Sequence, residues 1–129
     1  MPVINFDMKT NSVSIKSRCK SFGYAIQGIS SFFRQELNER IHLVATIVVI
    51  AGIICFKVSR SETVILVLAT GFVWAAEIFN TAIEEIVNFI SPGYHQKAKL
   101  IKDISAGAVL LSAFTALIIG IIVFGPKIF

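Results

Sequence analysis

The feature that most constrains this chain is an uncharged stretch that runs from Ile104 to Gly125. About 20 apolar residues in a helix cross the hydrocarbon core of a bilayer, which is about 30 Å thick. Of the 129 residues, 55% are apolar and 16% are charged, whereas a soluble domain has roughly 25% charged residues and at most about 50% apolar ones. The sequence therefore predicts an integral membrane protein with room for about three spans and no separate soluble domain.

Two shorter apolar stretches precede this one. The first runs from about Ile41 to Phe56. The second is uncharged from Thr63 to Ala76, which is only 14 residues, so its helix must continue past Glu77 to reach the other side of the bilayer. This continuation carries a carboxylate into the membrane. In the third stretch, the small residues 105–108 allow a neighbouring helix to approach closely.

The N-terminal region has a different character. Residues 1–16 are polar without a clear period, and we expect a mobile tail that is not a cleaved signal peptide. Residues 17–129 are predicted to form one all-α integral membrane domain, with an amphipathic interfacial helix followed by three transmembrane helices. The alternative for the first helix is that it packs on a soluble core. Its apolar face consists of Phe22, Ile26, Ile29, Phe33 and Leu37.

The positive charges predict the orientation in the membrane. Six Lys or Arg residues precede the first span and three follow the second, whereas three lie on the opposite side. Because Lys and Arg are retained in the cytoplasm, the N-terminus is predicted to be cytoplasmic and the C-terminus to lie outside. The net charge of +4 forms no dense basic run, so anionic lipid is the expected partner and nucleic acid is not. Cys19 and Cys55 are expected at different depths, and neither a disulfide nor a cysteine metal site is predicted.

A polar face interrupts the second span. Glu77, Asn80 and Glu84 are spaced i, i+3 and i+7, which places them on one side of a helix. A carboxylate near the membrane interior costs at least a few kcal/mol to insert, so these residues indicate a functional site. The alternative is that they only bond to neighbouring helices or mark the water boundary. Lys102 and the polar stretch 34–42 reach the same level, and carboxylates from two helices with a lysine suit Mg²⁺ and phosphate.

Five motifs surround this polar face, in a fixed order along the chain. They are Phe22-Gly-Tyr24-Ala with Gly28, Glu36-Leu-Asn38-Glu-Arg40-Ile-His42, Glu77-Ile-Phe-Asn80-Thr-Ala-Ile-Glu84, Tyr94-His95, and Lys102-Asp103-Ile-Ser-Ala-Gly-Ala-Val-Leu. In order and spacing, these motifs resemble the small prokaryotic diacylglycerol kinases and undecaprenol kinases. The resemblance covers roughly residues 18–125, which is nearly the whole chain outside the tail.

The resemblance implies an ATP- and Mg²⁺-dependent lipid kinase that phosphorylates the primary hydroxyl of undecaprenol or diacylglycerol at the cytoplasmic face of the bacterial inner membrane. It also implies a homotrimer whose active sites combine residues from neighbouring protomers. By motif position, Glu77 is the expected general base, Glu36 and Glu84 are the metal carboxylates, and Glu77 and Asn80 contact the lipid. The ATP and phosphate contacts are expected at Tyr24, Glu36, Asn80, Glu84, Lys102 and Asp103, with Asp103 supporting Lys102.

The sequence departs from the family at two positions. Members commonly carry Asp where this chain has Asn88, so a charge is absent four residues beyond Glu84. The family's N-terminal Arg that assists ATP would fall at Ser17, which makes the neighbouring Arg18 the candidate for that contact.

Other functions remain to be weighed against the kinase. A small transporter or assembly subunit that uses Glu77 as a proton or cation site is the main alternative, and a purely structural interaction protein is the third. The kinase is favoured because a transported cation does not require a phosphate-binding Lys102. No GxxxxGK[ST] loop or protein-kinase motif is present, as expected of this family. The stretch 38–42 is more similar to the undecaprenol kinases, which favours a polyprenol acceptor.

Overall fold

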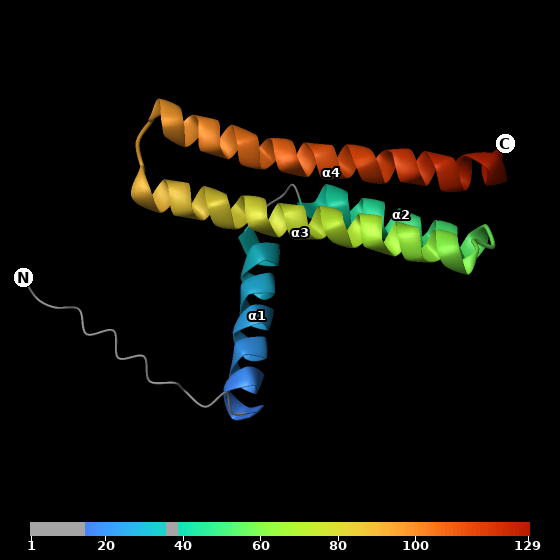
Figure 1. Ribbon diagram of the computed structural model, residues 1–129, viewed down its shortest axis with the longest axis horizontal. Coiled ribbons are helices and arrows are strands. Elements are labelled where there is room, and N and C mark those ends of the chain that lie inside the picture. Colours follow the sequence, from blue (N-terminus) through green and yellow to red (C-terminus); the bar gives the residue numbers. More distant parts are fainter. Residues whose placement is uncertain (1–14, 36–38) are drawn as a thin grey trace, which may run out of the picture. The chain divides into compact units, whose positions relative to one another are not determined.

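The computed structural model describes residues 15–35 and 39–129, and within these ranges every regular element is a helix. The four helices are α1 (Ile15–Gln35), α2 (Glu39–Cys55), α3 (Arg60–Ile90) and α4 (Gln96–Ile128) (Figure 1). The all-α prediction is therefore confirmed. Our expectations for residues 1–14, and those for Glu36 and Asn38, lie outside the described residues.

Helix α1 is the most strongly amphipathic of the four helices. It begins at Ile15, before the amphipathic pattern that starts at Phe22. Phe22, Ile26, Ile29 and Phe33 are all exposed. An exposed apolar face with polar residues around it is typical of a helix that lies in a membrane interface.

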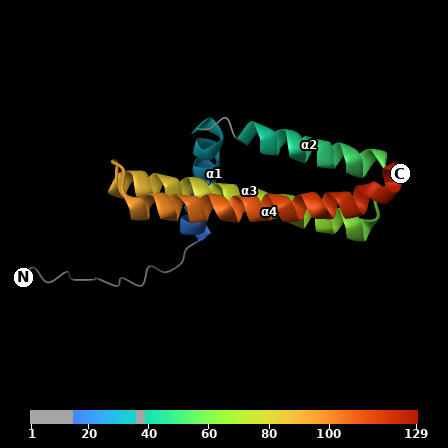
Figure 2. The same ribbon diagram turned by 90° about the horizontal axis from the view of Figure 1, so that it is seen from above.

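Helices α3 and α4 form an antiparallel hairpin, and they lie side by side in both views of the structure (Figures 1 and 2). Each of them is long and apolar enough to cross a membrane. With 31 residues, α3 is about 46 Å long at 1.5 Å per residue. The second span therefore continues past Glu77 without a break, as predicted. Helix α2 has 17 residues, at the short end of the range for a span.

The contact between α3 and α4 is narrow. Leu66, Val73 and Val87 of α3 and Ser105, Ser112 and Val123 of α4 are buried. Small side chains at Ser105 and Ser112 allow the two helices to approach closely. Of the small residues 105–108 that the sequence predicted for this contact, Ser105 is buried and the other three are exposed. The outer faces carry large exposed apolar side chains, such as Phe72 at 68% and Leu111 at 70%. Such surfaces suit lipid or neighbouring apolar helices rather than water.

The end of the hairpin where α3 begins is held by polar contacts. Ser59 forms a capping box with Glu62, in which the Ser59 hydroxyl accepts from the Glu62 N–H and the Glu62 carboxylate accepts from the Ser59 N–H. Lys127 Nζ lies 3.2 Å from the same carboxylate. This ion pair fixes the register between the start of α3 and the end of α4.

Near this end, α2 packs against α4 through a glycine. A Cβ added to Gly52 would lie 2.8 Å from ring carbons of Phe124. We expect Gly52→Ala to lower the free energy of unfolding by about 1 kcal/mol, because the ring must shift to admit the methyl group. Gly71→Ala is the matched control, since nothing lies within 4 Å of its added Cβ. Equal changes in the denaturant unfolding of both variants would contradict this close approach.

Candidate functional site

The polar residues of α3 lie at the opposite end from the Glu62–Lys127 ion pair. Along α3, Glu77 is about 22 Å and Glu84 about 33 Å beyond Glu62 at 1.5 Å per residue. If the Glu62–Lys127 pair marks one water boundary, a hydrocarbon core of about 30 Å places Glu77 about 8 Å inside the far boundary. Glu84 then stands at the headgroup level. The two carboxylates therefore differ in depth by about 10 Å.

Glu77 faces α2 and is paired with a histidine. Its Oε1 lies 2.5 Å from Nε2 of His42, and the two side chains are 12% and 21% exposed. One turn away, Trp74 Nε1 donates to Thr46 Oγ1 at 2.9 Å. Thr46 Oγ1 in turn donates to the His42 carbonyl oxygen at 2.7 Å. Two polar contacts thus join α2 to α3 at the level of the predicted base.

Asn80 turns toward α4 instead. Its Nδ2 donates to Glu84 Oε1 at 3.3 Å, an i, i+4 contact on the same helix. Its Oδ1 is buried and has no hydrogen-bond partner among the described residues. The spacing predicts one polar face for Glu77, Asn80 and Glu84, but the three side chains have different neighbours. Glu77 contacts α2, while Asn80 and Glu84 contact each other beside α4.

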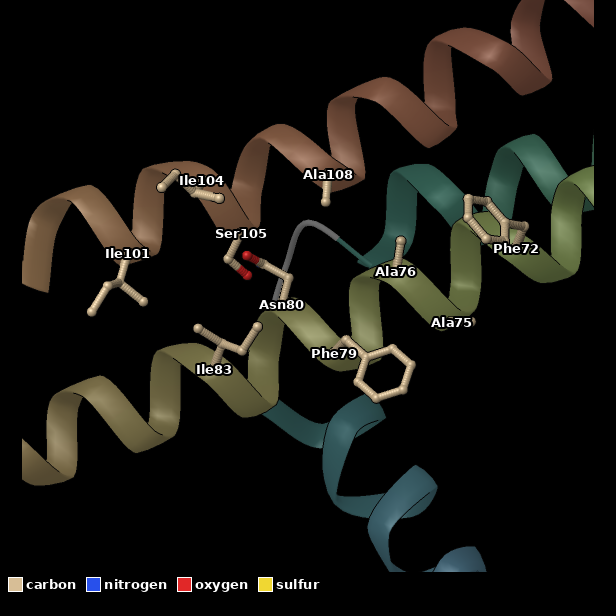
Figure 3. A pocket seen from close by; sticks show the side chains of 10 residues that line it. All are labelled: Phe72, Ala75, Ala76, Phe79, Asn80, Ile83, Ile101, Ile104, Ser105 and Ala108. Carbon is tan, nitrogen blue, oxygen red and sulfur yellow. The ribbon is translucent and has the colours of Figure 1, made fainter.

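A hollow of about 520 Å³ lies between α3 and α4 where Asn80 turns inward (Figure 3). Figure 3 shows Asn80 and Ser105 pointing toward each other across it. Ser105 Oγ is also buried without a hydrogen-bond partner in the described part of the chain. The remaining lining residues are Phe72, Ala75, Ala76, Phe79, Ile83, Ile101, Ile104 and Ala108. Two unpartnered oxygens thus stand in an otherwise apolar surface.

Lys102 and Asp103, which begin the third span, were expected to contact each other, and they do not. Asp103 pairs with Lys99, at 2.5 Å between Nζ and Oδ2, one turn earlier on α4. Lys102 instead donates to Asn88 Oδ1 of α3, at 2.5 Å. Adjacent residues on a helix point about 100° apart, so the two side chains have different partners here. The supporting role of Asp103 stays a prediction, and Asn88 is the partner to which Lys102 donates.

The oxygen ligands at this end fit a small hard cation. Asn80 Oδ1 is buried without a partner, and Glu84 carries a half-buried carboxylate that accepts one hydrogen bond from Asn80. Mg²⁺ is commonly held by one or two carboxylates together with phosphate oxygens, so this set suits it. Among the described residues, no group of three His, Cys, Asp or Glu side chains gathers around one point. The second predicted carboxylate, Glu36, lies outside those residues.

The predicted nucleotide contacts near the N-terminus lie on α1. Tyr24 is 69% exposed there, and Arg18 is exposed in the same helix. Ser17, where the family has its arginine, accepts a hydrogen bond on its carbonyl oxygen from Ser21. Helix α1 forms a compact unit separate from α2–α4. Tyr24 therefore belongs to the α1 unit.

Three residues of this site, His42, Asn88 and Ser105, face a neighbouring helix in a way that the sequence did not indicate. The sequence indicated His42 as part of a motif and of the polar stretch 34–42, Asn88 as a member of the polar stripe and a departure from the family, and Ser105 as a small residue. Each of them depends on which helix faces which, and spacing along one helix contains no such information. The one available signal was that Asn88 lies four residues beyond Glu84, close to the start of α4.

Known proteins are similar to this chain over most of its length. Residues 23–124 match the family model of the prokaryotic diacylglycerol kinases. The chain is 35% identical to the undecaprenol kinase of Bacillus subtilis over 122 residues, which cover 95% of this chain and 99% of that protein. It is 38% identical to the diacylglycerol kinase of Synechocystis sp. over 78% of this chain and 58% of that protein, and 28% identical to that of Escherichia coli over 86% and 91%. The chain therefore belongs to the prokaryotic diacylglycerol kinase family and is thereby identified as a lipid kinase.

Proposed function

We propose that this chain transfers a phosphoryl group from ATP to the primary hydroxyl of a membrane lipid, with Mg²⁺, at the cytoplasmic face of the bacterial inner membrane. The observation that carries this proposal is the position of Glu77 on α3, where it pairs with His42 about 10 Å before Glu84 along the helix. If Glu77 lies inside the membrane boundary, it meets the hydroxyl of a lipid there. Glu84 and Lys102 would then stand nearer the water, where the phosphates of ATP arrive. The base that accepts the hydroxyl proton would thus lie deeper in the membrane than the charged groups that bind the phosphates.

Phosphoryl transfer requires that the two substrates are aligned, that the phosphate charge is neutralised and that a base accepts the hydroxyl proton. The lipid hydroxyl oxygen forms a bond to the γ-phosphorus, the bond to the bridging oxygen of ADP breaks, and Glu77 accepts the hydroxyl proton. Lys102 meets phosphate charge. Glu84 and Glu36 are the proposed carboxylates for Mg²⁺, with Asn80 beside them. When bound, the metal supplies positive charge that offsets the phosphate oxygens.

The proposal includes the orientation of the chain in the membrane and its assembly into a homotrimer. Three spans, formed by α2, α3 and α4, would place the N-terminus in the cytoplasm and the C-terminus outside, because nine Lys or Arg residues lie on one side and three on the other. A homotrimer would cover part of the exposed apolar surface of α3 and α4. Tyr24 and Glu36 would then complete the nucleotide site, within one protomer or between two.

ATP consumption by the purified protein tests the proposal directly. Consumption should depend on added lipid and on Mg²⁺, with phosphorylated lipid as the product. Undecaprenol and diacylglycerol are compared in the same bilayer, with saturating ATP and lipid expressed as surface fraction. Because apolar grooves separate hydrophobic ligands by only about 1 to 3 kcal/mol per group, we expect activity on both lipids with higher kcat/KM for undecaprenol.

The outcomes separate the competing functions. A preference for diacylglycerol would overturn the polyprenol assignment and leave the kinase intact. No phosphorylation of either lipid by folded protein would contradict the kinase. Proton or cation flux into vesicles that depends on Glu77, without ATP consumption, would instead support the transporter.

The Lys102–Asn88 contact leads to a prediction about nucleotide affinity. In Asn88→Asp the lysine gains an ion pair that competes with phosphate, and exposed pairs contribute up to about 1 kcal/mol. The KM for ATP should therefore rise by up to about fivefold, with less change at high salt. Gln96→Glu is the matched control, since it adds the same charge at the start of α4 without replacing the partner of Lys102. An equal rise of KM in both variants would show that general charge, rather than this contact, sets the affinity.

A further inference from the structure

The contact between His42 and Glu77 is more than a link between two helices. The imidazole Nε2 meets Oε1 of the carboxylate at 2.5 Å, with 12% of the Glu77 side chain exposed. A carboxylate has two oxygens with lone pairs on each. One oxygen is engaged by His42, and the second remains for another donor.

The histidine is held in place independently of this contact. Its backbone carbonyl accepts from Thr46 Oγ1 at 2.7 Å, and its ring lies edge-on to Trp74, with centroids 6.2 Å apart at 66°. Trp74 is three residues before Glu77 on α3, so the same helix face supplies both the carboxylate and the ring that packs on its partner. The imidazole therefore approaches Glu77 from a constrained direction.

A base acts only when its reactive oxygen faces the proton that it accepts. The hydrogen bond from His42 removes rotational freedom from the Glu77 carboxylate. A reacting group that is held in the right orientation lowers the barrier.

We propose that His42 is a positioning residue for Glu77: its Nε2–H donates to Oε1 and thereby presents Oε2 to the hydroxyl of the acceptor lipid. This inference rests on the proposed lipid kinase function and adds to it a residue that selects the reactive oxygen of the base. It also explains why the histidine lies in the first turn of α2, which begins at Glu39, since that turn stands at the depth of Glu77.

The groups beside this pair lie on α2 and α3. On α2, Glu39 lies one turn before His42 and is buried. On α3, the ring of Trp74 packs edge-on against the imidazole. His42 contacts Glu77 directly, so substitution of His42 tests this contact.

The test compares His42→Gln with His42→Met in the full-length protein. Gln places an amide donor close to the position of Nε2, whereas Met has similar length and no donor. We expect His42→Met to lower kcat by about 10- to 100-fold and to leave the KM for ATP within about twofold. His42→Gln should recover most of kcat.

A structural control separates positioning from packing. Thr46→Val removes the hydroxyl that joins α2 to Trp74 and should lower the unfolding midpoint with a smaller loss of kcat than His42→Met. If His42→Met behaves in the same way, or if Gln and Met are equally impaired, the positioning role is overturned while the kinase stands. If wild-type protein phosphorylates no lipid, both proposals fall together. Loss of the imidazole Nε2–H hydrogen-bond signal by ¹⁵N NMR in Glu77→Leu, which has no acceptor, would support the contact itself, and an unchanged signal would overturn it.

Discussion

Replacing Glu77 by Gln should lower the kcat of lipid phosphorylation by about 10² or more, with the protein still folded. Gln has the size of Glu and an oxygen that still accepts from His42, so the contact between α2 and α3 is kept. What it lacks is basicity, because an amide does not take up the hydroxyl proton. The measurement is steady-state turnover with saturating ATP and lipid, together with the unfolding midpoint.

Glu85→Gln is the matched control for this experiment. It lies on the same helix, is exposed, and loses the same charge. Turnover close to that of the wild type in folded Glu77→Gln protein would eliminate Glu77 as the base. A loss of turnover accompanied by unfolding would assign Glu77 to the helix contact instead.

Replacing Glu84 by Gln should raise the Mg²⁺ concentration needed for half-maximal activity by about tenfold or more, since one anionic oxygen ligand is exchanged for a neutral amide. Turnover should recover at high Mg²⁺, unlike that of Glu77→Gln. Glu36→Gln is expected to behave in the same way. The measurement is a Mg²⁺ titration of activity at fixed ATP.

The neighbouring carboxylate tests whether this effect is local. Glu85 lies about 100° around α3 from Glu84 and should change the Mg²⁺ requirement less. An unchanged Mg²⁺ requirement in both Glu84→Gln and Glu36→Gln would show that these carboxylates serve another purpose. Equal shifts in Glu84→Gln and Glu85→Gln would indicate an effect of net charge at this end of the bundle.

The elements of this fold could be predicted closely because they depend on local properties. An uncharged stretch from Ile104 to Gly125 specifies a spanning helix by its length alone, and it lies inside α4. The interrupted second stretch also extended as predicted, since a helix that has begun to cross must satisfy its backbone until it emerges. The α1 apolar positions followed a period that is visible in the sequence.

The site was only partly predictable. The presence of a polar face on α3 followed from the spacing of Glu77, Asn80 and Glu84, and its chemistry followed from the resemblance to a family. The side-chain contacts within the site could not be derived from the sequence. The resemblance to the family implied that Asp103 supports Lys102, yet neighbouring residues of a helix diverge, and Lys102 donates to Asn88 of α3 instead.

The sequence by itself therefore determined the membrane class, the helical elements and the family, because hydrophobic length, periodicity and motif order are properties of one chain read in order. Only the tertiary structure decided that His42 meets Glu77, that Asn88 meets Lys102, and that Asn80 faces Ser105 across a hollow. Each of these pairs joins two helices. Their meeting depends on the rotation and register of one helix against another, which packing of small residues and end contacts such as Glu62–Lys127 set.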